Sequence, residues 1–564
     1  MMNRVETLQE LQRHPNVSVL IVGGGINGIG TFRDLALNGV DVLLVERGDF
    51  CSGASAASSH MAHGGIRYLE NGEFRLVREA VRERNAMLQN APHLVRPLPT
   101  TIPIFRRFSG MLNAPLKFLG LLDRPAERGS LVIKLGLMLY DAFTGSQRTV
   151  PRHRFMGKTE SLRRWGALNP EIVNTATYYD GAILQPERLG CELIEDAETA
   201  NGKARALNYV SLRGIQNGEV SMRDEVEGKE YTVRPSILVN AAGPWIDVCN
   251  QYLGASTQYI GGTKGSHIVL RHPELRGAIG DHEFFFENKD GRIVLIFPLY
   301  DRVLIGTSDI PVDDPDAVRC TDEEVDYFLD LVKRVFPKIS VRRADIVFRF
   351  SGVRPLAASK SKTAGQITRD HEIQVLDSGD AQPPFPVLSL VGGKWTSWRA
   401  FAEQATDRCL AILRRVRKVE TSRLAIGGGR EYPRNADSAG QLIDGLVAQL
   451  GASGERGRAL FERYGTRAGL VAGYIGEGSD IALKSNPDYS RREVEYIALR
   501  EKVVHLDDFL LRRSMLAMLG NVTRATLGEV ALALAEVLHW DRDRVAAEVA
   551  RCMDILRDKH QVQL

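Results

Sequence analysis

Long hydrophobic runs are absent from this sequence. No stretch approaches the roughly 18 consecutive apolar residues that a membrane-spanning helix needs, so we expect no transmembrane segment. Residues 1–15, MMNRVETLQELQRHP, are polar and charged, and they lack the apolar core of a secretory signal peptide. Both observations favour a cytoplasmic protein.

Paired cysteines and a strong charge of one sign are also missing. None of the six cysteines stands in a CxxC spacing, which argues against a disulfide framework and a zinc site and favours a reducing compartment. The net charge of +3 is too small to indicate a nucleic-acid partner. We therefore expect no bound metal and no nucleic acid. The length of 564 residues predicts two to four domains.

A glycine fingerprint is the strongest positive signal. The apolar run 17–22 predicts a buried strand, and Gly23, Gly25 and Gly28 follow it at the spacing of a dinucleotide-binding turn. A helical pattern comes next, and a second apolar strand then ends on Glu46. This is a complete βαβ unit with an acidic residue about 20 residues after the glycines.

Each part of this unit has a physical task. Gly23 permits the tight turn, Gly25 lets the backbone approach a pyrophosphate, and Gly28 lets helix and strand pack closely. The helix N-terminus offers free N–H groups to phosphates. Glu46 can accept hydrogen bonds from ribose hydroxyls. The stretch therefore predicts dinucleotide binding.

The next segment extends the predicted cofactor site. Residues 52–59 form a loop rich in small residues, which can wrap a cofactor with backbone donors and hydroxyls. The paired glycines of His63-Gly64-Gly65 allow close approach to a flat ring or a phosphate. A helix is expected over 69–94.

Further strands and helices alternate up to residue 415. The run 236–245 and the run 387–391 predict buried strands of the cofactor sheet, and an antiparallel hairpin over 291–306, with its turn at 298–301, predicts a separate layer. Other strands are expected at 206–212, 219–233, 265–270 and 346–354, and helices at 187–201, 321–336 and 397–415.

Residues 105–143 are open to two interpretations. The stretches 111–122 and 131–143 are strongly apolar, with Arg106, Arg107 and Lys134 among the basic residues dispersed around them. They are either a pair of buried helices or an interfacial surface that lies on a membrane.

The composition changes near residue 421. Gly427-Gly428-Gly429 is interpreted as a linker, and the remainder has a helical pattern with a capping box expected at 526–529. We expect a C-terminal helical domain without a motif for chemistry.

Eight motifs, in order along the chain, give it a resemblance to FAD-dependent glycerol-3-phosphate dehydrogenases of the membrane-associated respiratory type. They are GGGINGIG (23–30), ASSHMAHGGIRYLENGEFRLVREA (57–80), NAAGPW (240–245), KGSHIVL (264–270), IGTSD (305–309), SGVRPL (351–356), ITRDH (367–371) and GGKWTSWRAFAE (392–403). Only the glycine fingerprint is shared with all flavoproteins that bind two dinucleotides. The others are specific to this family.

The resemblance implies an α/β fold with three parts. It implies an FAD-binding, Rossmann-like domain of the glutathione-reductase type, a mixed or antiparallel sheet that covers the substrate, and the C-terminal helical domain over 421–564. The first two interleave within 1–420: the FAD-binding part is mainly 17–95, 186–250 and 345–415, and the substrate-capping sheet is mainly 96–185 and 255–344.

The resemblance also implies a set of site residues. The residues expected to bind FAD are Gly23, Gly25, Asn27, Gly28, Glu46, Arg47, Ser55, Ser58, Ser59, His63, Gly64, Gly65, Ala242, Gly243, Gly393, Lys394, Trp395 and Thr396. Those expected to bind the substrate are Arg354, Arg369, Lys394 and Tyr68, since arginines can fork onto phosphate oxygens.

For catalysis we favour His267 as the base, because histidine titrates near neutral pH, with His63 and Arg67 close to the flavin. Arg354 is the alternative group that polarises the reacting hydroxyl. Many relatives carry Lys or a similar residue at the position of His60, so a titratable imidazole could replace a cation near the cofactor.

The reaction implied by the resemblance is oxidation of sn-glycerol 3-phosphate to dihydroxyacetone phosphate. Hydride would pass from C2 to flavin N5, and electrons to ubiquinone or another quinone. The protein would sit peripherally on the inner face of the cytoplasmic membrane, and a homodimer is left open.

Several alternatives stay open from sequence. One is oxidation of another phosphorylated polyol, such as erythritol phosphate, and another is an oxidase that uses oxygen. An amine or amino-acid oxidase of the same fold, a flavin-binding sensor and an NAD-only enzyme are further alternatives.

Overall fold

The fingerprint strand β1 (Asn16–Val22) lies near the centre of the first sheet. It is parallel to β2 (Val42–Val45) on one side and to β10 (Glu230–Asn240) on the other. The strand order is β17-β18-β10-β1-β2-β7, with β7 at Ala204–Leu207, β17 at Glu372–Leu376 and β18 at Val387–Val391. All of these pairings are parallel except that of β17. The computed structural model describes residues 3–66, 73–107, 129–144, 149–287, 293–358, 370–378 and 383–564.

Two layers cover this sheet. The side chains of Val19 and Ile21 pack with α2 (Ile26–Leu37), α7 (Pro186–Ala200) and α11 (Trp398–Ile412). The alternate side chains pack in a second cluster with elements on the other face, namely α1 (Arg4–Arg13), β8 (Val210–Gln216) and β9 (Glu219–Asp224). Because both faces are covered, β1 and β2 are almost continuously apolar, as buried parallel strands require.

The second sheet has the order β15-β11-β14-β13-β12-β4-β6-β3, with β16 also paired to β11 and β5 to β6. Its pairings are antiparallel except that between β12 and β4, so the expected mixed sheet is confirmed. The strands are β3 (Met61–Ala62), β4 (Val95–Ile104), β5 (Arg154–Gly157), β6 (Asn174–Ile183), β11 (Thr263–Leu270), β12 (Glu283–Glu287), β13 (Ile293–Leu299), β14 (Arg302–Gly306), β15 (Ile310–Pro311) and β16 (Ile346–Arg354). The helices between these strands along the chain are α3 (Phe74–Asn90), α5 (Ser130–Thr144), α6 (Lys158–Arg164), α9 (Pro273–Ile279) and α10 (Asp322–Val335). Helix α8 (Ile246–Tyr252) instead follows β10 and packs against the first sheet.

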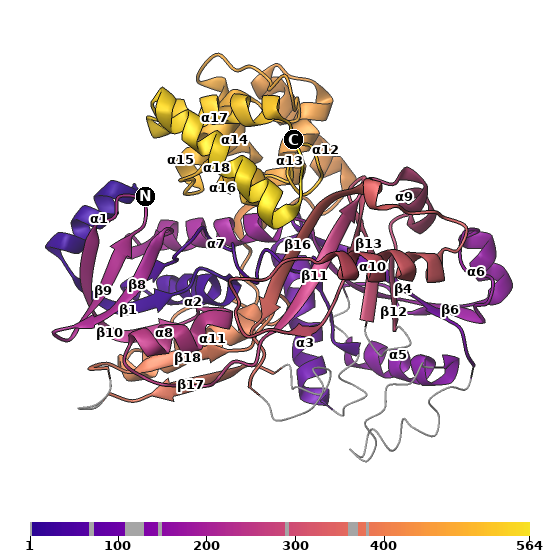
Figure 1. The fold of residues 1–564 in the computed structure, drawn as a ribbon, viewed down its shortest axis with the longest axis horizontal. Helices are drawn as coiled ribbons and strands as arrows, with labels where there is room; N and C mark the ends of the chain where they lie inside the picture. Colours follow the sequence, from indigo (N-terminus) through magenta and orange to yellow (C-terminus); the bar gives the residue numbers. More distant parts are fainter. Residues whose placement is uncertain are drawn as a thin grey trace.

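The C-terminal region is helical, as expected, and in Figure 1 it lies on one side of the molecule, next to α7 and β16. Its apolar residues share a core with Phe348 and Phe350 of β16. Its helices are α12 (Ala436–Leu450), α13 (Gly454–Tyr464), α14 (Ala468–Gly476), α15 (Arg491–Arg500), α16 (Leu506–Asp508), the π-helical turn η8 (Phe509–Arg513), α17 (Arg524–Leu538) and α18 (Arg542–His560).

Most expected elements are present with small shifts at their ends. The strands predicted at 346–354 and 387–391 have the expected bounds, and the helix predicted at 321–336 is α10. The strand predicted at 206–212 is two strands, because β7 ends at Leu207 and β8 begins at Val210. The strand predicted at 219–233 is likewise divided between β9 and β10. No helix among the described residues is long and apolar enough to cross a membrane.

The predicted glycine linker is wrong. Gly427–Gly429 is a buried 3-10 turn, η6, that packs against α7 and against the end of α13. A Cβ atom built on Gly428 would lie 1.8 Å from the carbonyl oxygen of Tyr464, and one on Gly429 would lie 2.3 Å from that of Asn90. These glycines allow close packing of backbones rather than flexibility.

The predicted capping box at 526–529 is also wrong. The N-cap of α17 is Thr523, whose hydroxyl accepts a hydrogen bond from the backbone N–H of Thr526 at 3.2 Å. The carboxylate of Glu529 instead accepts hydrogen bonds from the backbone N–H groups of Lys484 and Ser485.

The substitution Gly428→Ala should destabilise the protein by about 2 kcal/mol or more, because the new methyl group overlaps a backbone oxygen that cannot move freely. Gly440→Ala is the control: Gly440 lies inside α12 with open space around it, and this change should stabilise the helix by up to about 1 kcal/mol. Urea unfolding measures both variants. Equal stability of the two variants would support a flexible linker instead.

Candidate active site

A cavity of about 1930 Å³ is lined by residues of both sheets and of the C-terminal helices. Typical small-ligand pockets measure about 300–1,000 Å³, so this one has room for an extended dinucleotide together with a small substrate. Its walls include the turn after β1, the loop 46–59, the end of β10, the turn 392–396 and parts of β11 and β16.

The turn after β1 has the geometry that a pyrophosphate site needs. Gly23 has a φ of +112°, and a Cβ atom there would lie 2.5 Å from the carbonyl oxygen of Ala241. A Cβ on Gly28 would lie 2.0 Å from the carbonyl oxygen of Gly23. Helix α2 begins directly after Gly25, which has no side chain to cap the helix. The N–H of Ile26 donates to Ser55 Oγ at 3.0 Å, and the other N–H groups of the first turn are open to a ligand.

Glu46 is held in one orientation at the end of β2. Its two carboxylate oxygens accept hydrogen bonds from the backbone N–H groups of Gly24 at 2.7 Å and Gly48 at 2.9 Å. Burial raises the pKa of Glu46, and these two donors oppose that rise. Each oxygen retains a lone pair, so the group can accept hydrogen bonds from ribose hydroxyls.

The turn 392–396 forms another part of the cavity wall. Gly392 and Gly393 both have positive φ, and the side-chain N–H of Asn27 donates to the carbonyl oxygen of Gly392 at 3.1 Å. Trp395 Nε1 donates to the carbonyl oxygen of Ser55 at 3.0 Å. Helix α11 begins only at Trp398, so Lys394 lies in the turn before the helix.

The loop at His63 is held in place by the buried carboxylate of Asp180. The backbone N–H of Gly64 donates to Asp180 Oδ1 at 2.8 Å, and the hydroxyl of Tyr140 donates to the same oxygen at 3.0 Å. A Cβ atom on Gly64 would overlap the Tyr140 hydroxyl, so this glycine makes room for α5. Gly65 and His63 line the cavity, and the backbone N–H of His63 donates to Thr396 Oγ1 at 3.1 Å.

The second sheet supplies Arg354 and His267. Arg354 Nη2 donates to Thr307 Oγ1 at 2.8 Å, and Nη1 donates to Asp309 Oδ1 at 3.3 Å. The ring of His267 stacks on Phe350 with centroids 4.8 Å apart. Two glycines make space for these groups: a Cβ on Gly265 would lie 2.2 Å from Arg354 Nη2, and one on Gly306 would lie 2.1 Å from the His267 ring.

The environment keeps His267 neutral. Burial lowers its pKa well below the usual value, and the positive charge of Arg354 lowers it further. Nε2 lies 2.9 Å from Ser59 Oγ, and Nδ1 is buried without a hydrogen-bond partner among the described residues. A neutral imidazole at this position has a nitrogen that can accept a proton.

The structure brings most of the sequence-predicted site residues to one cavity. Gly28 and Gly64 do not line it, although both shape its wall, and Arg67, Tyr68 and Arg369 lie outside the described residues. The residues that line it are Gly23, Gly25, Asn27, Glu46, Arg47, Ser55, Ser58, Ser59, His63, Gly65, Ala242, Gly243, His267, Arg354, Gly393, Lys394, Trp395 and Thr396.

Sequence reasoning missed the residues that hold these groups. Asp180 lies in β6, and Thr307 and Asp309 follow β14 directly after the glycine that faces His267. Asp180 carried a weak signal, because it is the one charged residue in a strand whose residues are mostly buried. Thr307 and Asp309 belong to the IGTSD motif, which predicts no role for its polar residues by itself.

His60 is not a cofactor neighbour, which corrects the hypothesis that its imidazole replaces a cation there. It does not line the cavity, is fully buried, and its Nδ1 lies 3.1 Å from the carbonyl oxygen of Ile183. Burial lowers its pKa to about 4, so the ring is neutral at pH 7.

Comparison with known proteins agrees with this geometry. The pattern of the FAD dependent oxidoreductase family matches residues 18–376. The chain belongs to this family. The pattern described as the C-terminal domain of alpha-glycerophosphate oxidase matches residues 419–545.

Individual relatives cover nearly the whole chain. A glycerol-3-phosphate dehydrogenase of Synechocystis sp. is 33% identical, over 94% of this chain and 95% of that protein. The aerobic glycerol-3-phosphate dehydrogenase of Escherichia coli is 32% identical, over 89% of this chain and 94% of that protein. The resemblance to FAD-dependent glycerol-3-phosphate dehydrogenases is confirmed.

The fold is shared with a solved member of the family. The X-ray structure of a glycerol-3-phosphate dehydrogenase from Bacillus halodurans, complexed with FAD, has a TM-score of 0.75 and 23% identity, over 98% of this chain and 97% of that one. The cofactor of this protein is FAD. The uncapped N-terminus of α2, the two open lone pairs of Glu46 and the close packing at Gly23 fit an extended dinucleotide.

The buried state of His60 predicts a loss of stability in acid. Its pKa is about 4 in the folded protein and 6.5 in the unfolded chain, so the unfolded state binds the extra proton as the pH falls below 6.5. This costs about 2 kcal/mol between pH 7 and pH 5. His60→Gln should therefore lose less stability over that range, as measured by urea unfolding. The control is His14→Gln, which changes an exposed histidine, and its free energy of unfolding should depend on pH as that of the unsubstituted protein does. The same pH dependence in the unsubstituted protein and in both variants would contradict the prediction.

Proposed function

We propose that this protein oxidises sn-glycerol 3-phosphate to dihydroxyacetone phosphate and passes the electrons to ubiquinone or another membrane quinone. The strongest support for this proposal is that Arg354, Lys394 and His267 all line the cavity assigned to FAD. When bound, FAD supplies the acceptor for the hydride from C2 at flavin N5.

The two cations suit a phosphate group. Arg354 is half-buried and is aimed by Thr307 and Asp309, so its guanidinium is preorganised. Lys394 lies in the turn 392–396, which the side chain of Asn27 ties to the start of α2. A substrate with a phosphate dianion matches both charges.

His267 is the proposed base for the C2 hydroxyl. It accepts the proton at Nε2, where the Ser59 hydroxyl lies 2.9 Å away. In the unliganded protein the charge of Arg354 disfavours an imidazolium. A phosphate bound to Arg354 offsets that charge, so substrate binding itself raises the basicity of His267.

Anaerobic flavin reduction tests the substrate. sn-Glycerol 3-phosphate should bleach the flavin absorbance, whereas glycerol without a phosphate should not. Faster bleaching by erythritol phosphate would move the proposal to that polyol, and bleaching by amino acids alone would overturn it. Adding a soluble quinone in one arm and oxygen in the other then measures the preferred electron acceptor.

Arg354→Lys should raise the KM for the phosphorylated substrate by roughly 30- to 150-fold, because a charge-assisted, forked contact worth about 2–3 kcal/mol is lost. FAD content should not change. Arg349→Lys is the matched control: Arg349 lies on the same strand five residues earlier, pairs with Asp322 and does not line the cavity. A KM that rises equally in both variants would indicate a general disturbance of β16.

An amphipathic helix supports the proposed membrane contact. Leu131, Leu135, Met138 and Leu139 of α5 are 51%, 61%, 54% and 42% exposed, at the spacing of one helical face. Leu137 and Tyr140 on the other side are buried. In Figure 1, α5 lies at the edge of the molecule opposite the C-terminal helices. This supports the interfacial interpretation for 131–143. Residues 111–122 lie outside the described residues.

We therefore expect the double change Leu135→Glu, Met138→Glu to reduce binding to anionic phospholipid vesicles at least tenfold, since it removes two exposed apolar groups and adds two negative charges. Co-sedimentation with the vesicles measures this. The control is Leu470→Glu, Leu532→Glu, which changes two leucines of similar exposure in the C-terminal helices. If the control lost binding instead, the membrane surface would lie at the other end of the molecule.

A further inference from the structure

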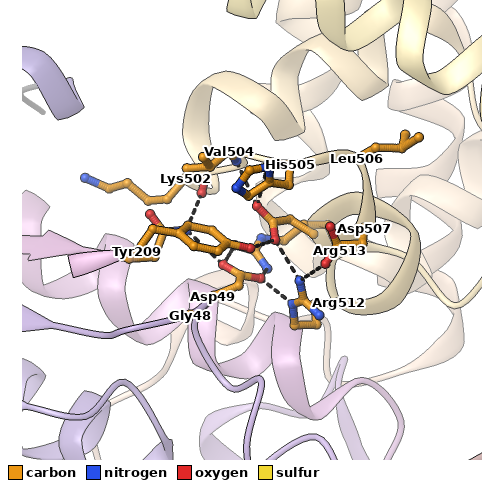
Figure 2. A network of polar contacts seen from close by, with 12 residues as sticks. Gly48, Asp49, Tyr209, Lys502, Val504, His505, Leu506, Asp507, Arg512 and Arg513 are labelled. Atoms are coloured by element: carbon orange, nitrogen blue, oxygen red, sulfur yellow. Dashed lines mark hydrogen bonds and ion pairs between the residues drawn. The ribbon is translucent and has the colours of Figure 1, made fainter. Parts of the chain in front are cut away.

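The C-terminal helices reach the cofactor loop through a buried cluster of charges, drawn in Figure 2. Its centre is Asp49, three residues after Glu46. Asp49 Oδ2 accepts hydrogen bonds from Arg512 Nε at 2.5 Å and Arg513 Nη1 at 2.7 Å, and Oδ1 accepts one from Arg513 Nη2 at 2.8 Å. The partners are more than 460 residues away in the sequence, in the π-helical turn η8.

Within this cluster, negative and positive side chains are paired with one another. Arg512 also donates to Asp507 and to Asp508, and Arg551 of α18 pairs with Asp507. Asp49, Asp507 and Asp508 thus face three arginines. Burial acts to raise the pKa of Asp49, but the guanidinium groups of Arg513 and Arg512 outweigh it and hold that pKa below its usual range.

A second set of hydrogen bonds holds the connection between β7 and β8. The Tyr209 hydroxyl donates to Asp508 Oδ1 at 2.6 Å, and the side-chain N–H of Asn208 donates to Asp49 Oδ1 at 2.9 Å and to the carbonyl oxygen of Lys502 at 2.8 Å. The C-terminal region therefore holds both segments that lie beside Glu46, namely 48–49 and 208–209.

Backbone hydrogen bonds connect these two segments to Glu46. The backbone N–H of Tyr209 donates to the carbonyl oxygen of Gly48 at 2.8 Å, and that of Val210 donates to the carbonyl oxygen of Glu46 at 2.7 Å. Gly48 N–H in turn donates to the Glu46 carboxylate. Glu46, Gly48, Asp49, Tyr209 and Arg512 all line the same cavity.

We propose that the C-terminal helical region is a clamp for the adenosine half of FAD, with Arg512 and Arg513 acting on Asp49 as positioning residues for Glu46. The proposal rests on the role of Glu46 in binding the ribose. It gives the C-terminal helices a task at the cofactor that differs from the roles proposed for Arg354, His267 and Lys394. Loss of the clamp should weaken FAD binding and leave the chemistry of the loaded enzyme in place.

The experiment is a measurement of FAD and ADP affinity on the full-length apoprotein. Asp49→Asn keeps the shape of the side chain but removes its charge, and it should raise the Kd for FAD and for ADP by the same factor, at least tenfold. With saturating FAD, kcat should stay within twofold. Arg512→Lys keeps the charge but loses the fork, and it should raise both Kd values about threefold or more; this variant carries the test if Asp49→Asn does not fold.

Glu493→Gln is the matched control. Glu493 is fully buried and pairs with Arg463 and Arg456 inside the C-terminal region, and it does not line the cavity. It should lower the urea midpoint without changing the Kd for FAD. If Asp49→Asn lowered only the urea midpoint in the same way, the cluster would be structural and the clamp would be overturned.

Glu46→Gln separates this proposal from the proposed function. If Glu46→Gln weakens FAD and ADP binding but Asp49→Asn and Arg512→Lys do not, the clamp is wrong and the ribose site stands. If none of the three weakens binding, the assignment of the ribose to Glu46 fails, and the clamp fails with it. Reduction of the bound flavin by sn-glycerol 3-phosphate is scored separately in each case.

Discussion

The structure depends on one close contact between three segments of backbone. The turn after β1, the first turn of α2 and the end of β10 meet where Gly23, Gly28 and Ala241 touch, and no Cβ atom fits at either glycine. This contact sets the direction of α2 and places its uncapped N-terminus beside the end of β10. The phosphate-binding geometry is therefore a consequence of backbone packing, with side chains added around it.

The same principle recurs in the second sheet. Gly265 and Gly306 provide the volume that the Arg354 guanidinium and the His267 ring occupy. The polar groups are then aimed by hydrogen bonds to neighbours, such as Thr307 for Arg354 and Ser59 for His267. A group fixed in this way does not need to reorganise when charge develops in the reaction.

Local sequence rules predicted the elements well where periodicity and end signals agreed, as in α10 and β16. They failed where a residue serves a contact far away in the chain. Gly427–Gly429 has the composition of a linker, yet it packs against α7 and α13. Glu529 has the spacing of a cap, yet it binds the backbone of Lys484 and Ser485. A local pattern contains no information about such partners.

The sequence by itself determined the βαβ unit, the identity of the cofactor class and a set of site residues most of which line the cavity. It could do so because glycine spacing and strand ends are local properties and the motifs are specific to the family. Only the tertiary structure decided that His60 lies away from the cofactor, that Asp180 holds the loop at His63, and that Asp49 joins Arg512 and Arg513. Each of these is a pairing of buried polar groups distant in sequence. Such groups must be satisfied on burial, but which partner satisfies them is settled only when the elements pack.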